Sequence, residues 1–427
     1  MQAQITLDSH NGELGCKRGR SALRRVSIDT PAERPPHEIN LMNAITALAR
    51  HARDTRLYLF LGLANWFIFL DHIPNNLVSS ITLRNFGFSG AAELFVFIIG
   101  YTAALTYAPI MLERGSIVGA TRVFRRAWQL YAAFIVLFAI YAVSIGDIAT
   151  RYAAPDIVYE FNVVALLDDP VRTITHGLLL QSKALNLDVL QLSVLLMACF
   201  PAVLWLMLRV PNFTLAGSFA LYVAARQFEW TLSTFPDGNW NFNPFCWQLL
   251  FVLGAWCALG GVSRFHTRFR KPVWAYLGLA FLVFAYAMTL AGHFPTLGNL
   301  LPAWLHDAFI PNDRANLAPY RILHFIVLAL FATRLIPKRW YALNSPVFRP
   351  LILCGEQALS VFCAGVLLSL AGHFVLVTGS GSPMQQILVS VAGIAIMTMV
   401  AGYASWSKRQ DGPSLAPIGH SASLRTG

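Results

Sequence analysis

The sequence predicts an all-α protein: a polytopic transmembrane helix bundle with about ten spans and both termini in the cytoplasm. Of its 427 residues, 56% are hydrophobic and only 12% are charged, whereas soluble domains carry about 25% charged residues. Apolar runs recur along the chain at lengths near the roughly 20 residues that a transmembrane helix needs. Composition and periodicity together exclude an ordinary soluble domain.

Nine apolar runs are long enough to be placed as spans, and a shorter tenth run completes an even number. An even number of spans puts both chain ends on the same side of the membrane. The runs lie near residues 57–74, 91–112, 127–147, 189–208, 214–228, 245–262, 273–292, 320–337, 356–377 and 384–406.

The basic residues orient this bundle. Cytoplasmic loops of membrane proteins carry an excess of Lys and Arg. With the N-terminus inside, 25 of the 32 Lys and Arg residues fall on the cytoplasmic side, including those of a loop expected at 113–127. The formal net charge of +11 therefore reflects orientation in a lipid membrane, and no nucleic-acid partner is expected.

Three regions follow from this reading. Residues 1–50 form a disordered, basic cytoplasmic tail and the start of an interfacial helix, whose periodicity extends from Glu38 to Arg56. Residues 51–406 form the transmembrane domain, and residues 407–427 form a cytoplasmic C-terminal tail. The N-terminal region lacks the short apolar core of a signal peptide. The six cysteines show no C-x-x-C pair, and no His, Cys or carboxylate spacing suggests a metal site.

The pair Asp71-His72 ends the first apolar run and is the strongest candidate for chemistry. Ionisable residues at membrane depth are costly and are by default a functional hypothesis. A neutral imidazole near the outer face could accept a proton from an alcohol. The alternative is an interfacial histidine satisfied by loop carbonyls. Neighbouring helical residues do not face one another, so a partner that orients His72 should come from another helix.

Glu93, at the outer start of the second span, is the best candidate for that partner. The helix dipole also favours a carboxylate there, which is its structural explanation. Arg84 is a basic residue on the outer side, against the general bias, and could pair with Glu93 or hold an anionic group of a substrate. Asn85 beside it and Asn75, just after His72, are further candidates for substrate binding.

The outer loops mix aromatic and amide side chains. Trp240 and Asn243 in particular would suit stacking on sugar rings and bonding to their hydroxyls. The alternative is an interfacial aromatic belt.

Several blocks of the sequence closely resemble the OpgC family, which belongs to the type 3 membrane acyltransferases. The resemblance extends from about residue 50 over nearly the whole remaining chain. Its blocks include Phe69-Leu70-Asp71-His72-Ile73-Pro74, Arg84-Asn85-Phe86-Gly87-Phe88-Ser89, Ala91-Ala92-Glu93-Leu94-Phe95-Val96-Phe97, Gly100-Tyr101, Phe242-Asn243-Pro244-Phe245 and Leu351-Ile352-Leu353-Cys354-Gly355.

This resemblance implies a multi-pass protein of the bacterial inner membrane that binds no cofactor. Its donor would be a cytoplasmic acyl-CoA, typically succinyl-CoA, and its acceptor a hydroxyl of a periplasmic glucan. His72 matches the histidine that acts as catalytic base in the wider class. Four polar positions of the family pattern are apolar, aromatic or small here: Tyr58, Leu61, Gly90 and Ile99.

Three functions therefore compete. The first is an O-acyltransferase with His72 as base, Glu93 and Asp71 as its partners, and Arg84 as an anion site. The second is a catalytically weakened member of the family that binds glucans or acts as an assembly component. The four positions that differ from the family pattern favour this second function. The third is a transporter of a small amphiphile, supported only by the multiple spans.

Overall fold

The computed structural model describes residues 54–151, 169–181, 186–261, 271–338 and 340–410. Within these ranges the chain is helical and contains no β-strand beyond one isolated bridge between Ser233 and Asn239. The all-α fold class is confirmed. The tails at 1–50 and 407–427, and the expected interfacial helix before Asp54, fall outside the described residues, except that α17 continues to Gln410.

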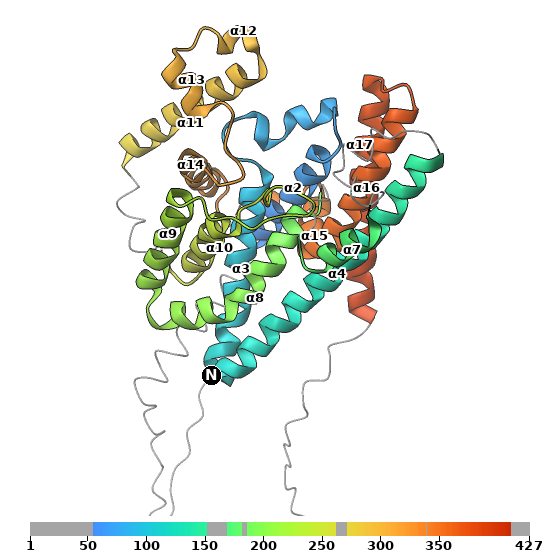
Figure 1. Cartoon of the computed structure of the whole chain (residues 1–427). Coiled ribbons are helices and arrows are strands. Elements are labelled where there is room, and N and C mark those ends of the chain that lie inside the picture. The colour runs from blue at the N-terminus through green and yellow to red at the C-terminus, as the bar shows by residue number, and fades with distance from the viewer. Residues whose placement is uncertain (1–53, 152–168, 182–185, 262–270, 339, 411–427) are drawn as a thin grey trace, which may run out of the picture. The chain divides into compact units, whose positions relative to one another are not determined.

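Every expected apolar run coincides with a helix (Figure 1). Six helices are long and apolar enough to cross a membrane. They are α3 (Ala91–Arg114), α4 (Ser116–Arg151, apolar through Ile145), α8 (Asp188–Arg209), α11 (Pro272–His293), α16 (Ala358–Thr378) and α17 (Pro383–Gln410).

The other four expected spans are shorter helices of 15 to 17 residues. At about 1.5 Å per residue, 17 residues cover roughly 26 Å, slightly less than a hydrocarbon core of about 30 Å. The total of ten spans and the positions of the termini therefore stay predictions. These helices are α2 (Thr55–Asp71), α9 (Pro211–Gln227), α10 (Pro244–Ala258) and α14 (Pro319–Leu335).

The expected loop at 113–127 is wrong. Only Gly115 separates α3 from α4, and α4 begins at Ser116. The reason is an amphipathic pattern that extends the apolar run backwards: Val123 and Ala127 are buried, whereas Arg122 and Arg125 are exposed. The basic residues of this region therefore lie on a helix.

Shorter helices complete the chain. Prolines in the first turn start many of them, because their missing N–H has no intrahelical partner there. The remaining α-helices are α7 (Pro170–Leu178), α12 (Pro295–Gly298), α13 (Ala303–Phe309) and α15 (Arg349–Glu356), and the 3₁₀ turns are η1 (Leu77–Ile81), η2 (Leu83–Asn85) and η5 (Tyr341–Asn344).

Two helix pairs pack backbone against backbone through glycines. A Cβ on Gly62 of α2 would lie 1.9 Å from the carbonyl oxygen of Leu351, and one on Gly355 of α15 would lie 1.9 Å from that of Tyr58. In the same way Gly100 of α3 faces α10. Small residues permit such close crossings of membrane helices. The Gly100 and Gly355 blocks are thus explained by packing.

Gly355→Ala should destabilise the protein, because its new methyl group cannot fit without moving α2 away from α15. Such overpacking typically costs about 1–3 kcal/mol. Thermal unfolding of the purified protein in detergent would measure it. Gly217→Ala in α9 is the matched control, since nothing lies within 4 Å of its added Cβ. Equal melting temperatures for the two variants would contradict the packing argument.

Candidate functional site

His72 lies immediately after α2, as the residue that caps its C-terminus. Its backbone N–H donates to the carbonyl of Ile68 at 3.0 Å. The side chain is partly exposed. Its Nδ1 atom is buried without a hydrogen-bond partner. Its Nε2 atom also has no hydrogen-bond partner among the described residues, but it is not buried. Nε2 is therefore the nitrogen that faces accessible space.

A buried polar cluster supports the backbone at His72. The amide nitrogen of Asn186, which is 2% exposed, donates to the His72 carbonyl at 3.5 Å, the Tyr141 hydroxyl at 3.2 Å and Ser369 Oγ at 3.3 Å. The Tyr141 hydroxyl in turn donates to the carbonyl of Val366 at 2.9 Å. This cluster connects the end of α2 with α4, α16 and the segment before α8.

Asp71 points to the turn that follows α2. Its Oδ1 accepts a hydrogen bond from Thr82 Oγ1 at 2.6 Å and forms an ion pair with Arg84 Nε at 3.9 Å. Arg84 therefore pairs with Asp71. Its neighbour Asn85 donates to the carbonyl of Ser79 at 2.7 Å. The side chain of Arg84 remains 52% exposed.

Glu93 does not contact His72 by any hydrogen bond. It is fully buried, and its Oε1 forms an ion pair with Arg321 of α14, whose Nε lies 2.8 Å away and whose Nη2 also contacts it. Its Oε2 accepts a bond from the backbone N–H of Gly90 at 2.9 Å, completing the start of α3. The pairings of Glu93 with His72 or Arg84 expected from the sequence are absent, because Arg321 occupies this carboxylate.

The block from Arg84 to Ser89 packs against α14. Ser89 Oγ and His324 Nδ1 lie 2.7 Å apart, and a Cβ on Gly87 would lie 2.1 Å from Nε2 of the same histidine. Phe88 enters an aromatic cluster with Phe309 and Tyr320. These contacts hold the Arg84 turn against the helix that carries Arg321.

Gly87→Ala should therefore lower the acyltransferase activity expected from the sequence without unfolding the protein. The added methyl group would displace His324 and shift the turn that carries Arg84. Activity normalised to the amount of folded protein in the membrane would measure this. Gly217→Ala again serves as the control. Unchanged activity would show that the turn tolerates the displacement.

Arg314 is a cation that the sequence reading did not select. It lies between α13 and α14, and its Cζ lies 4.4 Å from the centre of the Phe242 ring. Burial lowers the pKa of Arg314, with Arg321 and Arg84 acting in the same direction and Asp188 and Glu93 opposing. Its side chain is nevertheless exposed.

Arg314, Arg84 and His72 belong to one region. The charges of both arginines act on His72 and on Asp71. The region therefore combines an imidazole with two guanidinium groups, and it can accept a proton and attract an anion.

The other expected binding residues have separate surroundings. Asn75 is exposed and adopts a left-handed backbone conformation. Trp240 is 6% exposed, and its Nε1 is buried without a partner. Asn243 caps α10 and donates to Trp230 and Asn316, which uses its amide in holding loops together. No hydrogen bond or ring contact among the described residues joins these three to His72.

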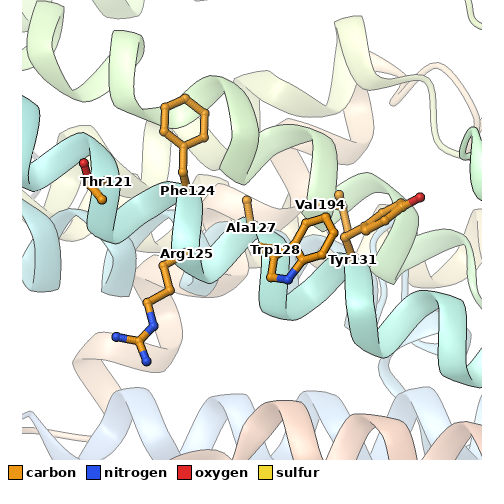
Figure 2. A pocket seen from close by; sticks show the side chains of 7 residues that line it. All are labelled: Thr121, Phe124, Arg125, Ala127, Trp128, Tyr131 and Val194. Carbon is orange, nitrogen blue, oxygen red and sulfur yellow. The ribbon is translucent and has the colours of Figure 1, made fainter.

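A shallow apolar hollow lies on α4, away from all predicted site residues (Figure 2). Three of its lining residues are aromatic, and Val194 of α8 contributes to its wall. None of the predicted site residues lines this hollow, and its composition suits lipid contact. Its lining residues are Thr121, Phe124, Arg125, Ala127, Trp128, Tyr131 and Val194.

Arg314 and Arg321 carried one sequence signal that could have identified them. The topology predicted from the sequence places both on the outer side, against the bias that orients the bundle. Asn186, Tyr141 and Ser369 carried no such signal, because isolated polar residues in apolar runs are common. Within the described ranges, no group of three or more His, Cys, Asp or Glu side chains could hold a metal ion.

The fold and this region define a class: a multi-helix membrane protein with a histidine and exposed guanidinium groups near the end of its first described helix. Residues 53–409 match the family model described as OpgC protein, and the chain belongs to the OpgC family. That membership places it among glucan-modifying membrane proteins. No curated protein and no solved structure matches the chain.

Proposed function

We propose that the protein is an O-acyltransferase of the bacterial inner membrane that transfers an acyl group, with succinyl as the expected one, from a cytoplasmic acyl-CoA to hydroxyls of periplasmic glucans. Membership in the OpgC family supports glucan modification. The observation that carries the catalytic part is His72, whose Nε2 faces accessible space beside two guanidinium groups.

His72 acts as general base in this proposal. Its Nε2 accepts the proton of a glucan hydroxyl as the hydroxyl oxygen attacks the thioester carbonyl. The new C–O ester bond forms, the C–S bond breaks, and the departing thiolate of CoA takes up the proton. Removal of the proton by a positioned base contributes about 10²- to 10⁴-fold to such reactions.

The remaining polar residues hold this base in place. Asn186 bonds to the carbonyl of His72, and Asp71 holds the turn that carries Arg84. Glu93 acts at a distance, by fixing α3 to α14 through Arg321. We therefore assign positioning roles to Asp71 and Glu93. Neither residue contacts the imidazole of His72 by a hydrogen bond.

A second candidate is a catalytically weakened member that binds glucans or supports their assembly. It is favoured by Leu61, which stands where the family pattern has an arginine and is buried in the apolar core at 6% exposure. No cation can act from that position. For a transporter, the described residues offer nothing beyond the apolar helices.

Mass spectrometry of periplasmic glucans tests the proposal. Glucans from cells with the protein should carry an added acyl mass, of about 100 Da per group if the acyl is succinyl, which disappears when the gene is deleted and returns with the intact gene. Identical glucan masses in both strains would overturn the acyltransferase proposal and favour the second candidate.

A further inference from the structure

Arg314 is a guanidinium without an ionic or hydrogen-bond partner for its side chain among the described residues. Its guanidinium lies over the face of Phe242, with Cζ 4.4 Å from the ring centre. The other outer arginines of the site are engaged: Arg321 binds Glu93, and Arg84 faces Asp71. Arg314 is exposed and makes no ion pair among the described residues, so its guanidinium is accessible to an anionic ligand.

The backbone that carries Arg314 is held firmly. Trp247 Nε1 donates to the carbonyls of Arg314 at 3.2 Å and Ala315 at 3.1 Å. Next to it, the Ala315 carbonyl accepts from the backbone N–H of Asn243 at 3.0 Å, and Leu317 accepts from Tyr222 at 2.8 Å. A free guanidinium on an anchored backbone is preorganised for a ligand, because little ordering is needed on binding.

The position of Arg314 limits the ligand. Arg314 lies over the ring of Phe242, and the neighbouring Asn241 donates to Asp188 at 2.8 Å. Asp188 is two residues after Asn186, which bonds to the carbonyl of His72, where the proposed reaction takes place. In an acyl-CoA, the phosphates are separated from the thioester by the long pantetheine arm. The free carboxylate of a short dicarboxylic acyl group, in contrast, lies only a few bonds from the reacting carbonyl. A glucan hydroxyl is neutral and would not compensate the cation.

We propose that Arg314 binds the free carboxylate of a dicarboxylic acyl group while its thioester lies at His72, and so selects diacid over monoacid donors. This inference rests on the proposed acyltransferase function. A guanidinium can hold a carboxylate through two parallel hydrogen bonds, which a lysine cannot reproduce. Phe242 keeps the guanidinium plane in position by contact with its face.

A competition assay tests the selection. Membranes containing the full-length protein and glucan acceptor receive succinyl-CoA and butyryl-CoA together, and mass spectrometry measures the ratio of succinylated to butyrylated glucan. Arg314→Gln should lower this ratio about 10- to 100-fold, as expected for loss of a hydrogen bond to a charged group. Arg314→Lys should give an intermediate ratio, because it keeps the charge and loses the paired bonds.

Arg172→Gln is the matched control, since Arg172 is an exposed residue on α7 with a surface ion pair to Asp169. It should leave the ratio unchanged. An unchanged ratio in Arg314→Gln, or an equal loss of both products, would overturn the inference while leaving the acyltransferase proposal intact. No transfer of either donor by the native protein would instead overturn the proposed function and this inference with it.

Discussion

His72→Ala should abolish glucan acylation while the protein remains in the membrane at its normal level. The variant removes the imidazole whose Nδ1 is buried without a partner and whose Nε2 is accessible in the region of Arg84 and Arg314. The loss should reach about 10²- to 10⁴-fold, the usual contribution of a general base. Acyl groups per glucan, measured by mass spectrometry and normalised to the protein in the membrane, give the result.

His293→Ala is a suitable control for this experiment. His293 ends α11, is exposed, and bonds only within its own helix, to the carbonyl of Thr289 at 2.8 Å. It should retain native activity. If His72→Ala also retained native acylation, the assignment of His72 as base would be wrong.

Glu93→Gln should strongly destabilise the protein. Glutamine keeps an acceptor for the Gly90 N–H, so the main change is the loss of the negative charge that compensates Arg321. Removing one partner of a buried ion pair typically costs about 3–5 kcal/mol, because the other charge stays buried and uncompensated. Thermal unfolding in detergent and the protein level in membranes would both reveal the loss.

The double variant Glu93→Gln with Arg321→Gln should recover part of this stability, since no uncompensated charge remains. Asp169→Asn provides the surface comparison: its ion pair with Arg172 is exposed, and such pairs contribute about 0–1 kcal/mol. Equal melting temperatures for Glu93→Gln and the native protein would show that the pair does not hold α3 to α14.

The helices could be predicted from the sequence because each depends on local information. The apolar runs located them, and residues such as Pro244 and Pro319 mark where helices begin. Residues 116–126 of α4 were missed because their arginines suggested a loop, although Val123 and Ala127 already continued the helical spacing. Charge alone is a poor guide where an amphipathic helix enters the membrane surface.

The site was only partly predictable, for a different reason. The sequence selected Asp71 and Arg84 but did not predict that they pair with each other, although they are only 13 residues apart in the chain. Glu93 and Arg321 are 228 residues apart, and nothing local indicates that they meet. From the sequence Glu93 was expected to orient His72 or to pair with Arg84, whereas in the structure it pairs with Arg321.

The close crossing of α2 and α15 has a consequence for how this protein is made. The helix that precedes His72 leaves the ribosome long before its packing partner: Trp66 contacts Cys354, 288 residues further on. Gly62 and Gly355 cannot meet until all the helices between them have been inserted. Arg321, the partner of Glu93, also follows long after Glu93. The region around His72 therefore assembles only after α15 has been made, and a chain that stops before α15 would carry His72 without this packing support.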